Sequence, residues 1–264
     1  MSGVLGTIGR RYEKTRDAFG FTLQQYIYFG GFPGLAPDIH DEDRWRNLME
    51  DTIITPILSR DILEIEEIRN PALLRQVFEL ACMESARELS LTKMQGTMNR
   101  GTVPTIKNYL NILDQTMTVM PLQKYAPSVI KEKNSIPKMQ VYNSAFRNRH
   151  GQFIFEEAVT NPTEWGRQVE SAVGAHLANR SQLDTFDLLY WRDDNKKECD
   201  YVLKKGQSLV AIEVKSSSAD DTSGFEKFKE QFGDHITAAF IVGPEGLPLE
   251  DFFSLDLNKL FKKQ

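Results

Sequence analysis

The sequence predicts an α/β protein, α+β overall, with a helical N-terminal half and a C-terminal part in which strands follow a long helix. Three observations favour this fold class. Apolar residues recur at helical spacing in several segments of residues 21–115. Short apolar runs bounded by polar turns occupy residues 188–215, as strands do. The 264 residues, 41% hydrophobic and 26% charged, suit one large or two smaller globular domains.

The first predicted domain, residues 1–69, is a helical segment. Residues 21–28 are expected to begin a helix that ends at a Gly/Pro cluster, residues 30–34, because glycine and proline mark turns. Residues 44–68 carry apolar side chains at helical spacing and predict a second helix. Pro56 is expected to kink or divide that helix, since proline removes a backbone donor.

The second predicted domain, residues 70–150, has the pattern of a winged helix-turn-helix domain. Two strands are expected over residues 117–122 and 138–142, with the wing between them. In helix-turn-helix proteins the second helix of the motif enters the major groove of DNA. Three helix starts are predicted, at Asn70 with Pro71, at Ser90, and at Thr102 or Pro104.

Charge distribution suggests where this domain would contact DNA. Residues 85–150 hold about ten lysines and arginines against about three acidic residues, although the whole chain has a net charge of −5. This asymmetry predicts one basic face, which would bind mainly phosphates. A winged helix used as a protein–protein spacer remains the alternative, because the recognition helix carries a single lysine. The candidate nucleic-acid-binding residues are Thr105, Lys107, Asn108, Lys131 and Lys133.

In the third predicted domain, residues 151–264, acidic residues interrupt apolar elements. Glu170 borders the apolar and small-residue face of a predicted helix, where a charge needs a partner or a metal. Asp200 lies on a predicted strand, and side-chain alternation puts Glu213 and Lys215 on one face of the next strand. Close carboxylates repel each other unless a cation lies between them. This patch therefore predicts a hard divalent cation, Mg²⁺ or Mn²⁺.

The elements after this patch complete the predicted order of the third domain. Phe225, Phe228 and Phe232 recur at helical spacing, and residues 236–242 form a final apolar run. The expected order is therefore helix, three strands, helix, strand.

The combination of helix Glu170, strand Asp200 and the Glu213-Val214-Lys215 motif resembles the PD-(D/E)xK nuclease core. The frame made by residues 191–192, 198–203 and 212–217 is similar to one branch of it. That branch is the domain of unknown function carried at the C-terminus of many bacterial and archaeal AAA-type ATPases. The resemblance implies a restriction-endonuclease-like α-β-β-β-α-β fold for the third domain.

The resemblance also implies roles for the four candidate catalytic residues. Asp200 and Glu213 would be metal ligands, and Glu170 an auxiliary acid. Lys215 would orient or activate the attacking water and stabilise charge on the phosphate. The implied chemistry is Mg²⁺-dependent phosphodiester hydrolysis. The alternative is a salt-bridge network on a solvated sheet face, which is common and weakly stabilising.

The resemblance covers the chain from about Phe21, and residues 30–34 are similar to the segment that follows the ATPase core in that family. The sequence has no G-x-x-x-x-G-K-[ST] phosphate loop, so we expect no ATP hydrolysis by this chain. Residues 1–69 would then follow a missing ATPase core, lost from a fragment or from the gene. Asn143 stands where the family usually has an acidic residue.

Three function classes follow from these expectations. The first is a Mg²⁺-dependent DNA nuclease module guided by a winged helix. The second is a non-catalytic DNA- or protein-binding regulatory module of an ATPase, and the third is an assembly subunit that docks a partner through its N-terminal helices. DNA and an ATPase domain or subunit are the expected partners, and no membrane is expected. Two separated cysteines, Cys82 and Cys199, and no signal-peptide pattern favour the cytoplasm.

Overall fold

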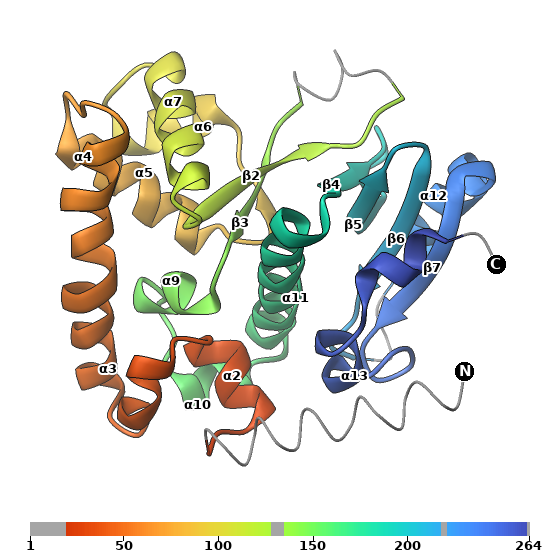
Figure 1. The fold of residues 1–264 in the computed structure, drawn as a ribbon, viewed down its shortest axis with the longest axis horizontal. Coiled ribbons are helices and arrows are strands. Elements are labelled where there is room, and N and C mark those ends of the chain that lie inside the picture. Colours follow the sequence, from red (N-terminus) through yellow and green to blue (C-terminus); the bar gives the residue numbers. More distant parts are fainter. Residues whose placement is uncertain (1–19, 128–134, 218–220, 263–264) are drawn as a thin grey trace.

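The computed structural model describes residues 20–127, 135–217 and 221–262. The chain is a mixed α/β protein with one seven-stranded sheet in the order β1-β3-β2-β4-β5-β6-β7. The N-terminal helices gather on one side of helix α11 (Pro162–Asp184), and the later strands lie on its other side (Figure 1). Among these described residues, no helix is both long and apolar enough to cross a lipid bilayer.

The N-terminal helices confirm the predicted segments with shifted boundaries. The first helix is capped by the Thr22 side chain and ends at Gly30, which has a positive φ of 75°. Pro56 does not divide the second segment, which stays helical from residue 42 to 65. It passes through π-helical turns on both sides of the proline. The elements are α2 (Leu23–Phe29), α3 (Glu42–Met49), the π turns Glu50–Ile54 and Ile57–Asp61, and α4 (Ile62–Ile65).

The next segment contains three helices and three strands. Asn70, Ser90 and Thr102 cap the helices as predicted, each accepting a backbone N–H with its side chain. Strand β1 was not predicted. Strand β3 pairs antiparallel with both β1 and β2. The elements are α5 (Pro71–Met83), β1 (Arg87–Glu88), α6 (Leu91–Met98), α7 (Val103–Gln115), β2 (Val119–Lys124) and β3 (Lys138–Val141).

Two short helices occupy the region expected to link the modules, α9 (Ser144–Arg149) and α10 (Phe155–Thr160). The Asn143 side chain caps α9 by accepting the Ala145 N–H at 3.1 Å. A Cβ atom on Gly30 would lie 1.9 Å from Asn143 Oδ1. The Gly/Pro turn after α2 therefore packs against the start of α9.

The C-terminal elements follow the predicted order. Strands β4, β5 and β6 are antiparallel, and β7 pairs parallel with β6. Strand β2 pairs parallel with β4, so the sheet continues across the boundary predicted at residue 150. The elements after α11 are β4 (Asp187–Arg192), β5 (Glu198–Lys205), β6 (Ser208–Val214), α12 (Ser223–Phe232) and β7 (Ile236–Val242).

Helices cover both faces of the C-terminal strands. Side chains of α11 pack against one face of β5 and β6, where Tyr201 and Ile212 are fully buried. Phe225 and Phe228 of α12 pack against the opposite face. The C-terminal tail carried little signal in the sequence, yet its α13 (Leu249–Phe253) and the turn Leu257–Phe261 bury apolar side chains against the α11 face. Burial of this apolar surface is the main stabilising contribution to both layers.

Gly174 allows α11 to approach the sheet closely. A Cβ atom there would lie 2.1 Å from Gln140 Oε1 and 2.3 Å from the Tyr201 hydroxyl oxygen. That hydroxyl also lies 2.9 Å from the carbonyl oxygen of Glu170. Glu170 can therefore take its position relative to β5 only because residue 174 is glycine.

Gly174→Ala is expected to lower the free energy of unfolding by about 2 kcal/mol or more, because the added methyl group overpacks a buried polar contact. Gly96→Ala is the matched control, since a Cβ on that exposed helical glycine meets nothing within 4 Å. It is expected to raise stability by up to about 1 kcal/mol through helix propensity. Urea unfolding of both variants measures the difference, and equal effects would contradict the proposed close approach.

Candidate functional site

A polar pocket lies where α11, β5, β6 and the start of α12 meet. Its volume is about 280 Å³. The fold brings Glu170, Asp200, Glu213 and Lys215 to its wall, so all four candidate catalytic residues share one pocket. The lining residues are Ala86, Glu170, Lys196, Lys197, Glu198, Asp200, Glu213, Lys215, Asp221 and Gly224.

A β-bulge in β5 turns the side chain of Asp200. The register between β4 and β5 shifts at Tyr190, which lies opposite both Asp200 and Tyr201. Bulges of this kind take a side chain out of strict alternation and are common beside functional sites. Asp200 consequently lines the pocket, whereas Tyr201 is buried under α11.

The two carboxylates predicted as metal ligands lie where β5 and β6 separate. Backbone pairing between these strands ends at Tyr201 and Ile212. Beyond this pair, Asp200 Oδ2 accepts the Val214 N–H at 2.8 Å, and Glu213 Oε2 accepts the Asp200 N–H at 3.4 Å. Backbone donors therefore hold both carboxylates in place on facing strands.

Lys215 lies beside Glu213, with 2.7 Å between Nζ and Oε1. Its ammonium group also donates to the carbonyl oxygen of Asp221 at 2.7 Å. An ammonium in this position keeps a positive charge at the pocket wall beside Glu213, in addition to the lining lysines Lys196 and Lys197. Such a group can bind a phosphate oxygen or orient a water molecule.

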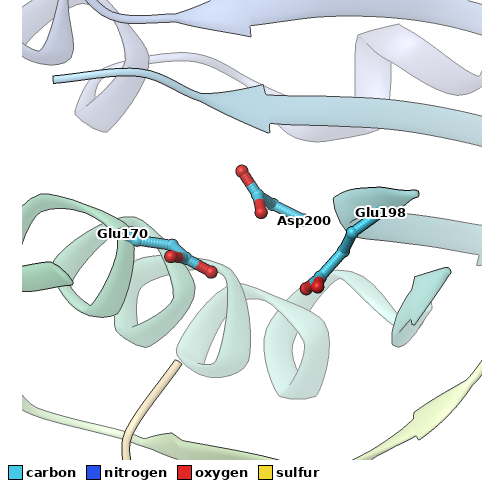
Figure 2. Close-up of side chains that lie close together, drawn as sticks. All are labelled: Glu170, Glu198 and Asp200. Atoms are coloured by element: carbon cyan, nitrogen blue, oxygen red, sulfur yellow. The ribbon is translucent and has the colours of Figure 1, made fainter. Parts of the chain in front are cut away.

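Three carboxylates on the inner side of the pocket form a tight group. One oxygen from each of Glu170, Glu198 and Asp200 lies within 4.8 Å of the others. Figure 2 shows the three side chains reaching toward a common space from a helix and a strand. Of the two predicted ligands, Asp200 belongs to this group, while Glu213 pairs with Lys215.

A buried lysine neutralises part of this group. Lys138 Nζ lies 2.6 Å from Glu170 Oε1, 2.8 Å from Glu198 Oε1 and 3.7 Å from Asp200 Oδ1. The Lys138 side chain is 1% exposed, and its ammonium lies 5.1 Å from the centre of the Tyr201 ring. The acidic group is therefore a salt-bridge cluster centred on a lysine from β3.

Two members of this cluster, Lys138 and Glu198, are not among the predicted site residues. Lys138 was placed in a wing strand, far along the chain from the acidic residues. Its one signal is a charged residue at the start of a short strand whose residues are all buried. Glu198 lies within the motif that carries the resemblance, two residues before Asp200, and side-chain alternation along the strand puts it on the same face as Asp200, a signal that could have found it.

Burial and mutual repulsion alter the acidity of these groups. Burial raises the pKa of Glu170 to about 7, with Lys138 opposing the shift and Asp200 adding to it. Burial and the Asp200 charge raise the pKa of Glu213 to about 8, against the opposing effect of Lys215. Burial also raises the pKa of Asp200. For Lys138, burial acts to lower the pKa, but the carboxylates together raise it well above the usual lysine value.

The candidate nucleic-acid-binding residues are placed as follows. Lys107 is exposed on α7. Thr105 Oγ1 lies 2.9 Å from Thr102 Oγ1 at the start of the same helix, and Asn108 donates to Glu66 Oε1 at 3.0 Å. The last contact puts an acidic side chain beside the predicted recognition helix. Lys131 and Lys133 lie outside the described residues.

Part of the basic excess in residues 85–150 faces inward. Arg147 is buried and pairs with Glu164 at 2.8 Å, and Arg149 pairs with Glu50 at 3.5 Å. Together with Lys138, these cations compensate acidic residues of neighbouring segments. They therefore do not contribute to a basic surface of the kind predicted from the charge count.

Two family models match the chain. The first, Domain of unknown function (DUF8612), covers residues 20–153, about half of the chain, and the second, Domain of unknown function (DUF4143), covers residues 165–256. The second domain is typically found in AAA-ATPase-associated proteins, and no AAA-type ATPase model is among the matches. No curated protein and no solved structure matches the chain. The chain therefore belongs to the family of the domain of unknown function DUF8612, followed in sequence by a DUF4143 domain.

Proposed function

We propose that this pocket hydrolyses phosphodiester bonds of DNA with the help of a bound Mg²⁺ or Mn²⁺ ion. The observation that carries the proposal is the meeting of Asp200, Glu213, Lys215 and Glu170 in one pocket. These residues come from three different elements. Their convergence supports a site rather than a chance motif in the sequence.

The donor atoms suit a hard divalent cation. Mg²⁺ and Mn²⁺ prefer oxygen ligands, and the pocket offers carboxylates from both β5 and β6. Five acidic side chains line the pocket, against three lining lysines and the buried Lys138 paired with them. We infer that Asp200 and Glu213 would hold the ion, with Glu170 as the auxiliary acid.

Each residue has a defined part in the proposed reaction. When bound, the divalent ion would polarise the phosphate and lower the pKa of a water molecule. Lys215 would hold a phosphate oxygen or orient the attacking water, since its ammonium lies at the pocket wall beside Glu213. Glu170, with a pKa of about 7, can take up or release a proton near neutral pH. The winged-helix interpretation of residues 70–150 supplies the DNA contacts in this proposal.

A second candidate is the non-catalytic alternative, a DNA- or protein-binding regulatory module of an ATPase. One observation favours it. Lys138 already forms ion pairs with Glu170 and Glu198. These acidic side chains can therefore be explained as a structural ion-pair cluster that needs no metal or substrate. A cleavage assay together with a DNA-binding assay separates the two candidates.

Asp200→Asn and Lys215→Ala are each expected to reduce metal-dependent cleavage by about 100-fold or more. The first removes a proposed ligand charge but keeps an oxygen that can accept the Val214 N–H. The second removes the proposed water-orienting ammonium. Plasmid nicking with Mg²⁺ and Mn²⁺ measures activity, and titration calorimetry measures metal binding by the same samples.

Asp187→Asn, which removes a carboxylate from an exposed position on β4, is the matched control and is expected to leave cleavage unchanged. Circular dichroism checks that all three variants are folded. Full cleavage by both pocket variants would overturn the proposed site. Absence of both metal binding and cleavage in the wild type would favour the regulatory alternative.

Metal affinity is expected to increase by at least about tenfold between pH 6 and pH 8. Glu213, a proposed ligand with a pKa of about 8, holds a proton at pH 6 that a bound ion must displace, and the charge of the ion would also favour loss of the proton from Glu170, whose pKa is about 7. Binding should therefore release protons. Mn²⁺ titrations in two buffers of different ionisation enthalpy measure both the affinity and the proton release.

The stability of the metal-free protein should also depend on pH, and this dependence tests the raised pKa values independently of metal binding. Both carboxyl groups have raised pKa values in the folded state, so the folded chain binds more protons than the unfolded chain between about pH 4.5 and about pH 8. Their contribution to stability is present at low pH and is lost as the pH rises through 7 to 8. A pH-independent affinity together with a pH-independent stability would contradict the raised pKa values.

Lys107→Glu is expected to weaken binding to duplex DNA and to reduce the salt slope of log Kd by about 1, if α7 contacts a phosphate. Lys259→Glu, at an exposed site in the C-terminal turn, is the control for the change in net charge. Fluorescence anisotropy over a range of salt concentrations measures both quantities. Equal binding by the two variants would argue against α7 as the DNA-contacting helix.

A further inference from the structure

The position that a cation would take among Glu170, Glu198 and Asp200 is filled by the protein itself. Among the described residues, these three carboxylates form a group of three whose oxygens lie within 4.8 Å of one another, close enough to share one ion. The Lys138 ammonium has its shortest contacts with two of them, at 2.6 and 2.8 Å. The third contributes a backbone oxygen at 3.4 Å and a carboxylate oxygen at 3.7 Å.

These contacts can satisfy all three N–H donors of the Lys138 ammonium group. An ammonium group has three N–H donors, and oxygens of three different residues surround Nζ. The side chain is 1% exposed and lies against the Tyr201 ring, so bulk water does not hydrate the charge. A divalent ion could enter this position only by displacing Nζ.

We propose that Lys138 is a positioning residue whose ammonium takes the cation position among Glu170, Glu198 and Asp200 and excludes a divalent ion from it. If the proposed function holds, on which this second step rests, the pocket then binds one divalent ion at Asp200 and Glu213 rather than a pair. Two-metal hydrolytic sites need ions only about 4 Å apart. The fixed positive charge of Lys138 would thus restrict the pocket to hydrolysis with one metal ion rather than two.

The origin of the lysine adds a structural consequence. Lys138 begins strand β3, in the DUF8612 part of the chain, whereas the carboxylates belong to the DUF4143 part. One half therefore supplies the counter-charge for the other. Both the geometry and the metal content of the pocket depend on the docking of β3.

Lys138→Met tests the proposal through the number of Mn²⁺ ions bound per chain, measured by electron paramagnetic resonance and by titration calorimetry. The expected result is one additional Mn²⁺ ion in the variant compared with the wild type. Without metal, the melting temperature should fall by about 10 °C, because buried carboxylates lose their partner. Saturating Mn²⁺ should restore most of that loss.

Two further variants serve as controls. Lys138→Arg keeps the positive charge and is expected to keep the wild-type number of bound ions. Lys93→Met removes a lysine from an exposed position on α6 and should change neither the ion number nor the melting temperature. If Lys138→Met does not fold without metal, Lys138→Gln is used, and recovery of the folded circular dichroism spectrum on adding Mn²⁺ is the supporting result.

The outcomes distinguish this inference from the proposed function. No additional ion in Lys138→Met, or no recovery of either neutral variant with Mn²⁺, would overturn the role of Lys138. One ion in the variant and none in the wild type would support that role and count against a metal site at Asp200 and Glu213. Two ions in the variant and one in the wild type would support both.

Discussion

The structure around the pocket depends on one electrostatic constraint, the burial of several carboxylates in a small space. Buried charges of one sign are unstable unless a counter-charge or backbone donors compensate them. Lys138 meets this need for Glu170 and Glu198, the Val214 N–H meets it for Asp200, and Lys215 together with the Asp200 N–H meets it for Glu213. The raised pKa values of Glu170 and Glu213 show that the compensation is incomplete.

Sheet continuity makes this compensation available. Strand β3 pairs with β2, and β2 pairs parallel with β4, so the strand that carries Lys138 is fixed relative to β5. Two local features complete the arrangement. The bulge opposite Tyr190 turns Asp200 into the pocket, and Gly174 lets α11 bring Glu170 close to the sheet. A change at any of these places would move a carboxylate relative to its partner.

Local signals allowed much of the fold to be predicted from sequence. Side chains at Asn70, Ser90 and Thr102 cap helices where expected, because capping depends on a few consecutive residues. The order of elements after residue 161 also followed from periodicity and turn residues. Glu170 and Asp200, which the motif singled out, line the pocket, and their catalytic roles stay a prediction. Lys138 could not be predicted, because its contacts depend on strand pairing between distant segments. Helices α9 and α10 are too short to show a clear period.

The parallel pairing of β2 with β4 has an evolutionary consequence. The two matched families meet in sequence between residues 153 and 165, but the sheet has no break there. Exchange of either half by recombination would expose a strand edge and separate a buried lysine from its acidic neighbours. The DUF8612 and DUF4143 parts are therefore expected to be inherited as one unit rather than recombined with other domains. The join between the two families is therefore a border in the sequence and not a border between independently exchangeable structural modules.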